Sequence, residues 1–264
     1  MKLIIAFLKR GTILTAFVLA AIAMQSSAQD QVPAVKNIIL VHGAWADGSS
    51  WDKVIPILQE RGFQVTAVQL SLASLENDVA ITERAIALED GPVLLFGHSS
   101  GGEVISEAGN DPKVAGLVFV AAFAPDTGES VLSLLQQGPP TPIANEFHQD
   151  SAGFLKLTEK GISEDFAQQR TPKEKGILFA TQGPAAAAAA LSAPLAGSPA
   201  WRSKLNWYVV AADDRAIPPD LERTMAQRMG AVTITLPSCH VAMLAEPEEV
   251  ARFIIRATST DQGK

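Results

Sequence analysis

The sequence GHSSG at residues 97–101 has the residue types and spacing of a nucleophilic turn. It fits the pattern G-x-S-x-G, in which a sharp turn between a strand and a helix holds a serine hydroxyl clear of the sheet. The apolar run PVLLF precedes it and the stretch GGEVISEAGN follows it, so the sequence offers both flanking elements. We therefore predict that Ser99 is a nucleophile. The alternative is a small residue in a tight structural turn.

A serine nucleophile needs a base, and the chain has four histidines: His42, His98, His148 and His240. The chain order expected for this turn is serine, acid, histidine, which leaves His148 and His240. His148 lies in a region with no strand end before it to present an acid, whereas His240 follows the run AVTITLP on a short loop. His240 is therefore the predicted general base.

Two adjacent aspartates are candidates for the acid that orients this base. Asp213 and Asp214 end the stretch NWYVVAADD, at the edge of the sheet where catalytic groups gather in open α/β folds. Asp126, after another apolar run, is a weaker candidate. The residues alone leave the choice between Asp213 and Asp214 open, and the pair could also be a plain turn with a surface ion pair.

An acyl-transfer site also needs backbone N–H groups where an oxyanion forms. One usually comes from the residue after the nucleophile and one from a loop after an early strand. Ser100 and Ala44, the latter in the stretch LVHGAW, occupy those two places. We expect them to form the oxyanion hole, with no proton-transfer role for His42.

Elements that could position these residues alternate along the chain from residue 37 onward. Strands are expected at 37–43, 63–70, 92–98, 114–122, 206–214 and 231–237, and helices at 77–89, 100–110, 219–230 and 246–258. The strand runs lack polar alternation, which is typical of strands buried on both faces. The sequence therefore predicts a single α/β domain with a mostly parallel, doubly wound sheet.

The alternation breaks between about residues 125 and 201, which contain scattered prolines and glycines and the alanine run 185–190. A disordered linker is one interpretation. However, the region holds large apolar side chains at Phe147, Phe154, Leu155, Leu157, Phe166, Leu178 and Phe179. These suit a solvated tether poorly, so we predict a helical cap inserted between two strands. Trp45 and the cap phenylalanines would line an apolar substrate pocket.

The N-terminal segment has the pattern of a secretory signal peptide. Lys2, Lys9 and Arg10 precede an uncharged run at 11–24, and the small residues SSA end at position 28. The run is short against the roughly 20 residues of a membrane-spanning helix. We therefore expect residues 1–28 to be removed and the remaining chain to be periplasmic or secreted, without a stable membrane anchor.

The charge and the cysteine content argue against a nucleic-acid-binding protein and against a protein stabilised by internal disulfides. Residues 1–28 hold three of the 21 basic and none of the 28 acidic residues, so the mature chain has 18 basic against 28 acidic residues, a net charge of −10. Such a chain is a poor nucleic-acid binder. Cys239 is the single cysteine, so no internal disulfide can form.

Four motifs carry a resemblance to a known family: VHGAW, GHSSGG, DDRAIPP and CHVAMLAEP, in this order. Together they resemble the α/β-hydrolase superfamily, and most closely the branch of bacterial esterases that is similar to plant methyl esterases and hydroxynitrile lyases. The similarity covers about residues 36–258 and is weakest in the cap.

The resemblance implies a role for each matching position. It places the nucleophile on Ser99, the base on His240 and the oxyanion donors on Ala44 and Ser100. It also selects the second of the two adjacent aspartates, Asp214, as the acid.

Two departures favour hydrolysis over lyase chemistry. Plant hydroxynitrile lyases carry a lysine directly after the catalytic histidine and a threonine after the early-strand histidine, where this chain has Val241 and Gly43. We expect a serine esterase for a small hydrophobic or aromatic ester, with no metal or organic cofactor. Amidase, lactonase or perhydrolase chemistry on the same residues is an alternative, as is a ligand-binding protein without turnover. The oligomeric state is not indicated.

Overall fold

The computed structural model describes residues 35–258, and the signal peptide expected at 1–28 lies outside them. Six strands form the main sheet: β1 (Asn37–Val41), β2 (Gln64–Ala67), β3 (Val93–Ser99), β4 (Val114–Ala122), β8 (Leu205–Ala211) and β9 (Val232–Leu236). Their order is β2-β1-β3-β4-β8-β9, and each neighbouring pair is parallel. The sheet therefore needs crossover connections, which helices supply.

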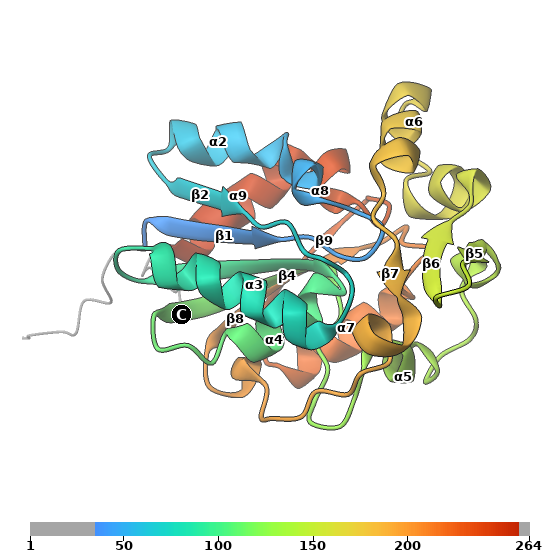
Figure 1. The fold of residues 1–264 in the computed structure, drawn as a ribbon. Helices are drawn as coiled ribbons and strands as arrows, with labels where there is room; N and C mark the ends of the chain where they lie inside the picture. The colour runs from blue at the N-terminus through green and yellow to red at the C-terminus, as the bar shows by residue number, and fades with distance from the viewer. Residues whose placement is uncertain (1–34, 259–264) are drawn as a thin grey trace, which may run out of the picture. The chain divides into compact units, whose positions relative to one another are not determined.

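Helices cover both faces of this sheet because successive side chains along each strand point to opposite faces. Ile39 and Val41 pack with one set of helices, and Ile38 and Leu40 pack with the other. The first set is α3 (Leu75–Leu88), α4 (Gly101–Ala108) and α7 (Pro219–Arg228). The second is α2 (Val54–Glu60), α8 (Ala242–Ala245) and α9 (Pro247–Thr258). Figure 1 shows the two sets on either side of the sheet. The predicted α/β fold is confirmed.

The carboxyl ends of the central strands meet at one edge of the sheet. Val41 is in register with Gly97, and Ser99 with Ala122. The loops after β1, β3, β8 and β9 therefore converge at this edge, where ligand sites of open α/β sheets lie.

The segment between β4 and β8 forms a cap at the same edge (Figure 1). The sequence had suggested a purely helical cap, and this expectation is wrong. The cap contains the helices α5 (Val131–Leu135) and α6 (Pro172–Thr181) together with a three-stranded antiparallel sheet. The cap strands are β5 (Phe147–Gln149), β6 (Phe154–Leu157) and β7 (Ala185–Ala186). The alanine run starts as strand β7 because Pro184 precedes it and β6 pairs with it, which overrides the helix propensity of alanine.

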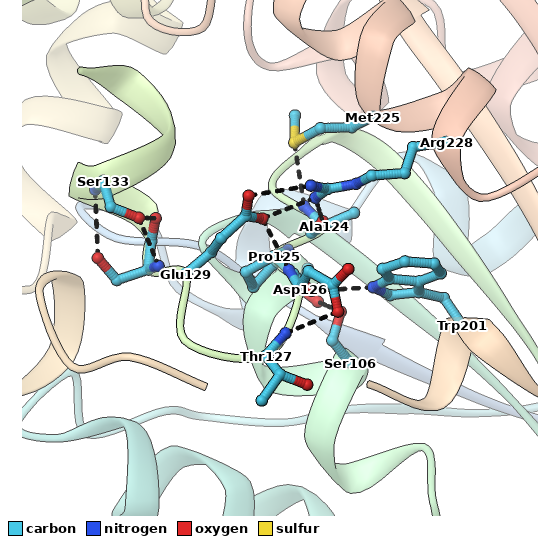
Figure 2. A network of polar contacts seen from close by, with 12 residues as sticks. Ser106, Ala124, Pro125, Asp126, Thr127, Glu129, Ser133, Trp201, Met225 and Arg228 are labelled. Atoms are coloured by element: carbon cyan, nitrogen blue, oxygen red, sulfur yellow. Dashed lines mark hydrogen bonds and ion pairs between the residues drawn. The ribbon is translucent and has the colours of Figure 1, made fainter. Parts of the chain in front are cut away.

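The two ends of the cap are joined at its base. The Trp201 indole N–H donates to the Pro125 carbonyl at 2.9 Å, and Arg202 forms an ion pair with Asp126. Glu129 binds Arg228 of α7 at 2.9 Å. Figure 2 shows this contact beside the one between Trp201 and Pro125. The first and last residues of the cap are thus bonded to each other, and the start of the cap is also bonded to α7.

None of the helices in the described part of the chain has the length and apolar character needed to cross a membrane.

Candidate active site

Ser99 lies at the tip of a strained turn between β3 and α4. Its φ is +53°, in the left-handed region that L-residues adopt only at a cost of about 1–2 kcal/mol. Neighbouring atoms approach too closely for larger residues: a Cβ on Gly43 would lie 2.5 Å from the Ser99 Cβ, and one on Gly97 would lie 2.6 Å from the Gly101 backbone oxygen. These glycines therefore allow the turn to close while the Ser99 side chain faces a cavity.

His240 lies on the loop after β9 and is held by Asp214 from the loop after β8. The His240 Nδ1 is 2.6 Å from Asp214 Oδ2, and both side chains are buried. Asp214 Oδ1 accepts the N–H groups of Ala216 and Ile217 at 2.7 and 2.9 Å. With Nδ1–H donated to the carboxylate, the ring presents an unprotonated Nε2, and His240 lines the same cavity as Ser99.

The other acid candidates lie elsewhere. Asp213 is exposed, and its Oδ2 accepts a hydrogen bond from Gln169 Nε2 at 2.9 Å. Asp126 is engaged by Arg202 at the base of the cap. Of the three aspartates considered from the sequence, the structure brings only Asp214 against His240.

The remaining histidines have other contacts. The ring of His42 accepts the Leu70 N–H at Nε2, 2.9 Å away, and its Nδ1 lies 2.8 Å from the Gly43 carbonyl oxygen. Burial lowers the pKa of His42, so the ring is a neutral bridge that holds the loop after β1. His98 is fully buried, with its Nε2 3.1 Å from the His240 carbonyl oxygen and its pKa lowered by burial. His148 is exposed on β5.

The two residues expected to supply the oxyanion hole are hydrogen-bonded to each other, through the Ala44 amide and the Ser100 hydroxyl. The sequence did not suggest this bond. The Ala44 N–H donates to the Ser100 Oγ at 2.8 Å, and both residues line the cavity. The sequence had indicated a role only for the Ser100 amide. The Ser100 hydroxyl thus occupies the position relative to Ala44 N–H where an oxyanion would bind.

A cavity of about 460 Å³ lies between the turn and the cap. None of the described residues lining it is Asp, Glu, Lys or Arg, and most are apolar, including Phe123, Leu135 and Ile217. Trp45 lines it and joins it to the cap: its indole N–H donates to the Leu155 carbonyl at 3.0 Å, and its ring centroid is 4.9 Å from that of Phe147. The site can therefore accommodate an uncharged, largely apolar molecule next to Ser99.

Comparison with known proteins identifies the family. Residues 38–253 match the alpha/beta hydrolase family. The chain belongs to this family. The pyrethroid hydrolase of Sphingobium wenxiniae is 29% identical over 248 residues, covering 83% of this chain and 86% of the relative. Salicylic acid-binding protein 2 of Nicotiana tabacum is 26% identical over 256 residues, covering 83% and 96%, and other relatives are named methylesterases.

The fold is shared with solved structures. A pyrethroid hydrolase from Sphingobium faniae JZ-2 superposes with a TM-score of 0.73 at 24% identity, covering 86% of this chain and 98% of that one. The expected branch of the alpha/beta hydrolases is thus confirmed, and the names of the relatives support hydrolysis as its chemistry.

Three further residues of this alpha/beta hydrolase contact the site or its supporting loops, and of these only Phe166 was noted from the sequence, as a cap phenylalanine expected to line the pocket. The ring centroid of Phe166 in the cap lies 5.0 Å from that of His240. Gln169 bridges the two loops, since its Oε1 accepts the Cys239 N–H at 2.7 Å and its Nε2 binds Asp213. Glu222 of α7 is close to Asp214, since Glu222 Oε2 accepts the N–H of Ala211, whose carbonyl accepts the Asp214 N–H. The contacts of Phe166 and Gln169 join segments far apart in the chain, so no local motif marks them.

Cys239, directly before His240, is fully buried. Burial raises the pKa of its thiol, which keeps the sulfur protonated and weakly nucleophilic.

Proposed function

We propose that this alpha/beta hydrolase is a serine esterase that cleaves carboxylic esters of small hydrophobic or aromatic substrates through an acyl-enzyme. One arrangement carries the proposal: Ser99 on a strained turn and His240, bonded to the buried Asp214, open into one uncharged cavity. Relatives named pyrethroid hydrolase and methylesterase support the same chemistry.

In the proposed reaction, Ser99 Oγ attacks the ester carbonyl carbon while His240 Nε2 takes its proton. Asp214 stabilises the imidazolium through its bond to Nδ1. The amides of Ala44 and Ser100 bind the oxyanion after the Ser100 hydroxyl turns away from the Ala44 N–H. Collapse releases the alcohol with the proton from His240, and water then hydrolyses the acyl-Ser99.

The cavity supports neutral substrates over charged ones. A carboxylate or ammonium group buried there would find no oppositely charged Lys, Arg, Asp or Glu among the described lining residues. Burying an unpaired charge costs several kcal/mol, so charged acyl or alcohol groups should be rejected.

The test is the intact mass of the protein after exposure to a fluorophosphonate, together with hydrolysis of p-nitrophenyl esters. Wild type should gain one adduct, and Ser99→Ala should gain none and lose ester turnover. Ser106→Ala is the matched control because it removes another buried hydroxyl, bonded to the Gly102 carbonyl at 2.7 Å, from α4, the helix that follows the Ser99 turn. It should keep both adduct and turnover.

A folded wild-type protein that forms no adduct would overturn the esterase proposal and leave a ligand-binding role. An adduct with turnover only of amides or lactones would keep the nucleophile but change the substrate class.

A further inference from the structure

Glu222 places a second carboxyl group close to Asp214, the acid of the site, because it binds the N–H of Ala211, whose carbonyl accepts the Asp214 N–H at 3.3 Å. It lies on α7, and its side chain is completely buried. Its Oε2 accepts the Ala211 N–H at 3.0 Å, whereas no N–H or O–H group of residues 35–258 donates to its Oε1. An ionised carboxylate here would leave one charged oxygen buried and unpaired, which is strongly unfavourable.

Asp214 is much better supplied with donors. Its two oxygens accept three N–H groups, from Ala216, Ile217 and the His240 ring. The negative charge is therefore stabilised on Asp214, whereas Glu222 has one backbone donor for two oxygens. Two neighbouring buried carboxyl groups cannot both ionise readily, so the less solvated one takes the proton.

The electrostatics agree with this assignment. Burial raises the pKa of Glu222 well above its usual range, and the charge of Asp214 and a hydrogen bond to it raise that pKa further. The titratable and charged groups around the pair are His240 and Cys239 from the loop after β9, Tyr208 from β8, and Arg223 from α7. Arg223 is largely engaged at the surface by Asp220, 2.7 Å away.

From this geometry we infer that Glu222 is a neutral carboxylic acid that donates its proton in a hydrogen bond to the Asp214 carboxylate, extending the serine, histidine and aspartate by a fourth, positioning residue. The proton stays on Glu222 throughout turnover. By sharing the charge of Asp214, Glu222 limits how strongly Asp214 holds the protonated form of His240. The effect on catalysis rests on the proposed function, whereas the protonation state of Glu222 does not.

The first experiment therefore needs no activity. Infrared spectra of wild type and Glu222→Gln in H₂O and D₂O at pH 7 should differ by the carbonyl band of one buried, protonated carboxylic acid, which shifts in D₂O. Glu103→Gln is the matched control because Glu103 is the other fully buried glutamate of residues 35–258. It should lose a separate band and keep that of Glu222. Absence of a protonated band assignable to Glu222 would overturn the inference.

The second experiment is the pH dependence of kcat/KM. Glu222→Gln keeps a neutral donor for Asp214 and an acceptor for the Ala211 N–H. The acid limb of the profile, where kcat/KM falls as the pH is lowered, should therefore move its midpoint by less than about 0.3 pH units. Glu222→Met removes the donor, leaves more charge on Asp214, and should move the limb up by about one unit. Asp220→Asn, which removes an exposed carboxylate from the same helix, should leave the limb unchanged.

An ionised Glu222 would give the opposite result. Glu222→Gln would then remove a negative charge near His240 and shift the acid limb down by about one unit. A purely structural Glu222 would lower stability in both variants without moving the limb. Either outcome overturns the inference. If the wild type shows the infrared band but forms no fluorophosphonate adduct, only the esterase proposal is overturned.

Discussion

The Ala44 N–H and the Ser100 Oγ, 56 positions apart in the chain, are joined by a hydrogen bond of 2.8 Å. In the proposed reaction this bond must break before the Ala44 amide can bind an oxyanion. A neutral hydrogen bond of this kind contributes about 1 kcal/mol net.

Ser100→Ala should therefore raise kcat for a p-nitrophenyl ester by about two- to five-fold, since the amide is free from the start and about 1 kcal/mol corresponds to about five-fold in rate. The backbone N–H of residue 100 is retained, so the second donor is kept. A tenfold loss in steady-state kcat would instead mean that the Ser100 hydroxyl itself donates to the oxyanion.

Asp214→Asn and Asp213→Asn form a matched pair of neighbouring substitutions. Asp214→Asn loses the carboxylate against His240 Nδ1 and should lower kcat by about 10⁴-fold, because the amide favours the wrong tautomer. Asp213→Asn changes an exposed side chain and should stay within about three-fold of wild type. Steady-state kinetics of both variants would show the ranking, and the reverse order would place the acid at 213.

Glu103 makes stability depend on pH. It is fully buried on α4, and burial, with a smaller contribution from the charge of Glu107, raises the pKa of Glu103 from 4.5 to about 9. Between these values the native state holds a proton that the unfolded chain has released. This proton linkage therefore lowers the free energy of unfolding by about 1.4 kcal/mol per pH unit as pH rises.

Glu103→Gln removes this linkage. We expect the difference in free energy of unfolding, variant minus wild type, to rise by about 3 kcal/mol between pH 6 and pH 8. This change does not depend on how much the substitution itself costs, and urea unfolding at both pH values measures it. Asp220→Asn, at an exposed position, should run parallel to wild type. Parallel curves for Glu103→Gln would show that Glu103 is ionised in the native state.

Trp45→Phe tests how the cap is held over the cavity. The ring contact with Phe147 can remain, but the indole N–H bond to the Leu155 carbonyl is lost. We expect KM to rise about three- to ten-fold with kcat within two-fold, and the free energy of unfolding to fall by about 1 kcal/mol. Trp201→Phe loses the equivalent bond to Pro125 at the base of the cap and should leave KM unchanged. Equal KM values for the two variants would contradict the role of Trp45.

Export of the protein is a further proposal that the sequence carries. N-terminal sequencing of the exported protein should begin at Gln29, because the small residues before it suit a signal peptidase. An exported form that retains Met1 would contradict the cleavage.

Local sequence was sufficient for the features that depend on short-range geometry. The G-x-S-x-G turn at Ser99 and the alternating strands and helices could be predicted because their signals lie within a few residues. The cap strands could not, since β7 forms only where β6 pairs with it.

The partners of each side chain were decided only by the tertiary structure. Asp213 and Asp214 have the same chemistry and adjacent positions, and it is the packing of the loops after β8 and β9 that buries Asp214 against His240 and leaves Asp213 exposed. Likewise, the sequence determines that α7 contains a glutamate, but only the folded chain removes Glu222 from water and places it against Asp214. The protonation state of that glutamate depends on this burial, because the cost of ionisation is set by the groups that replace water around it.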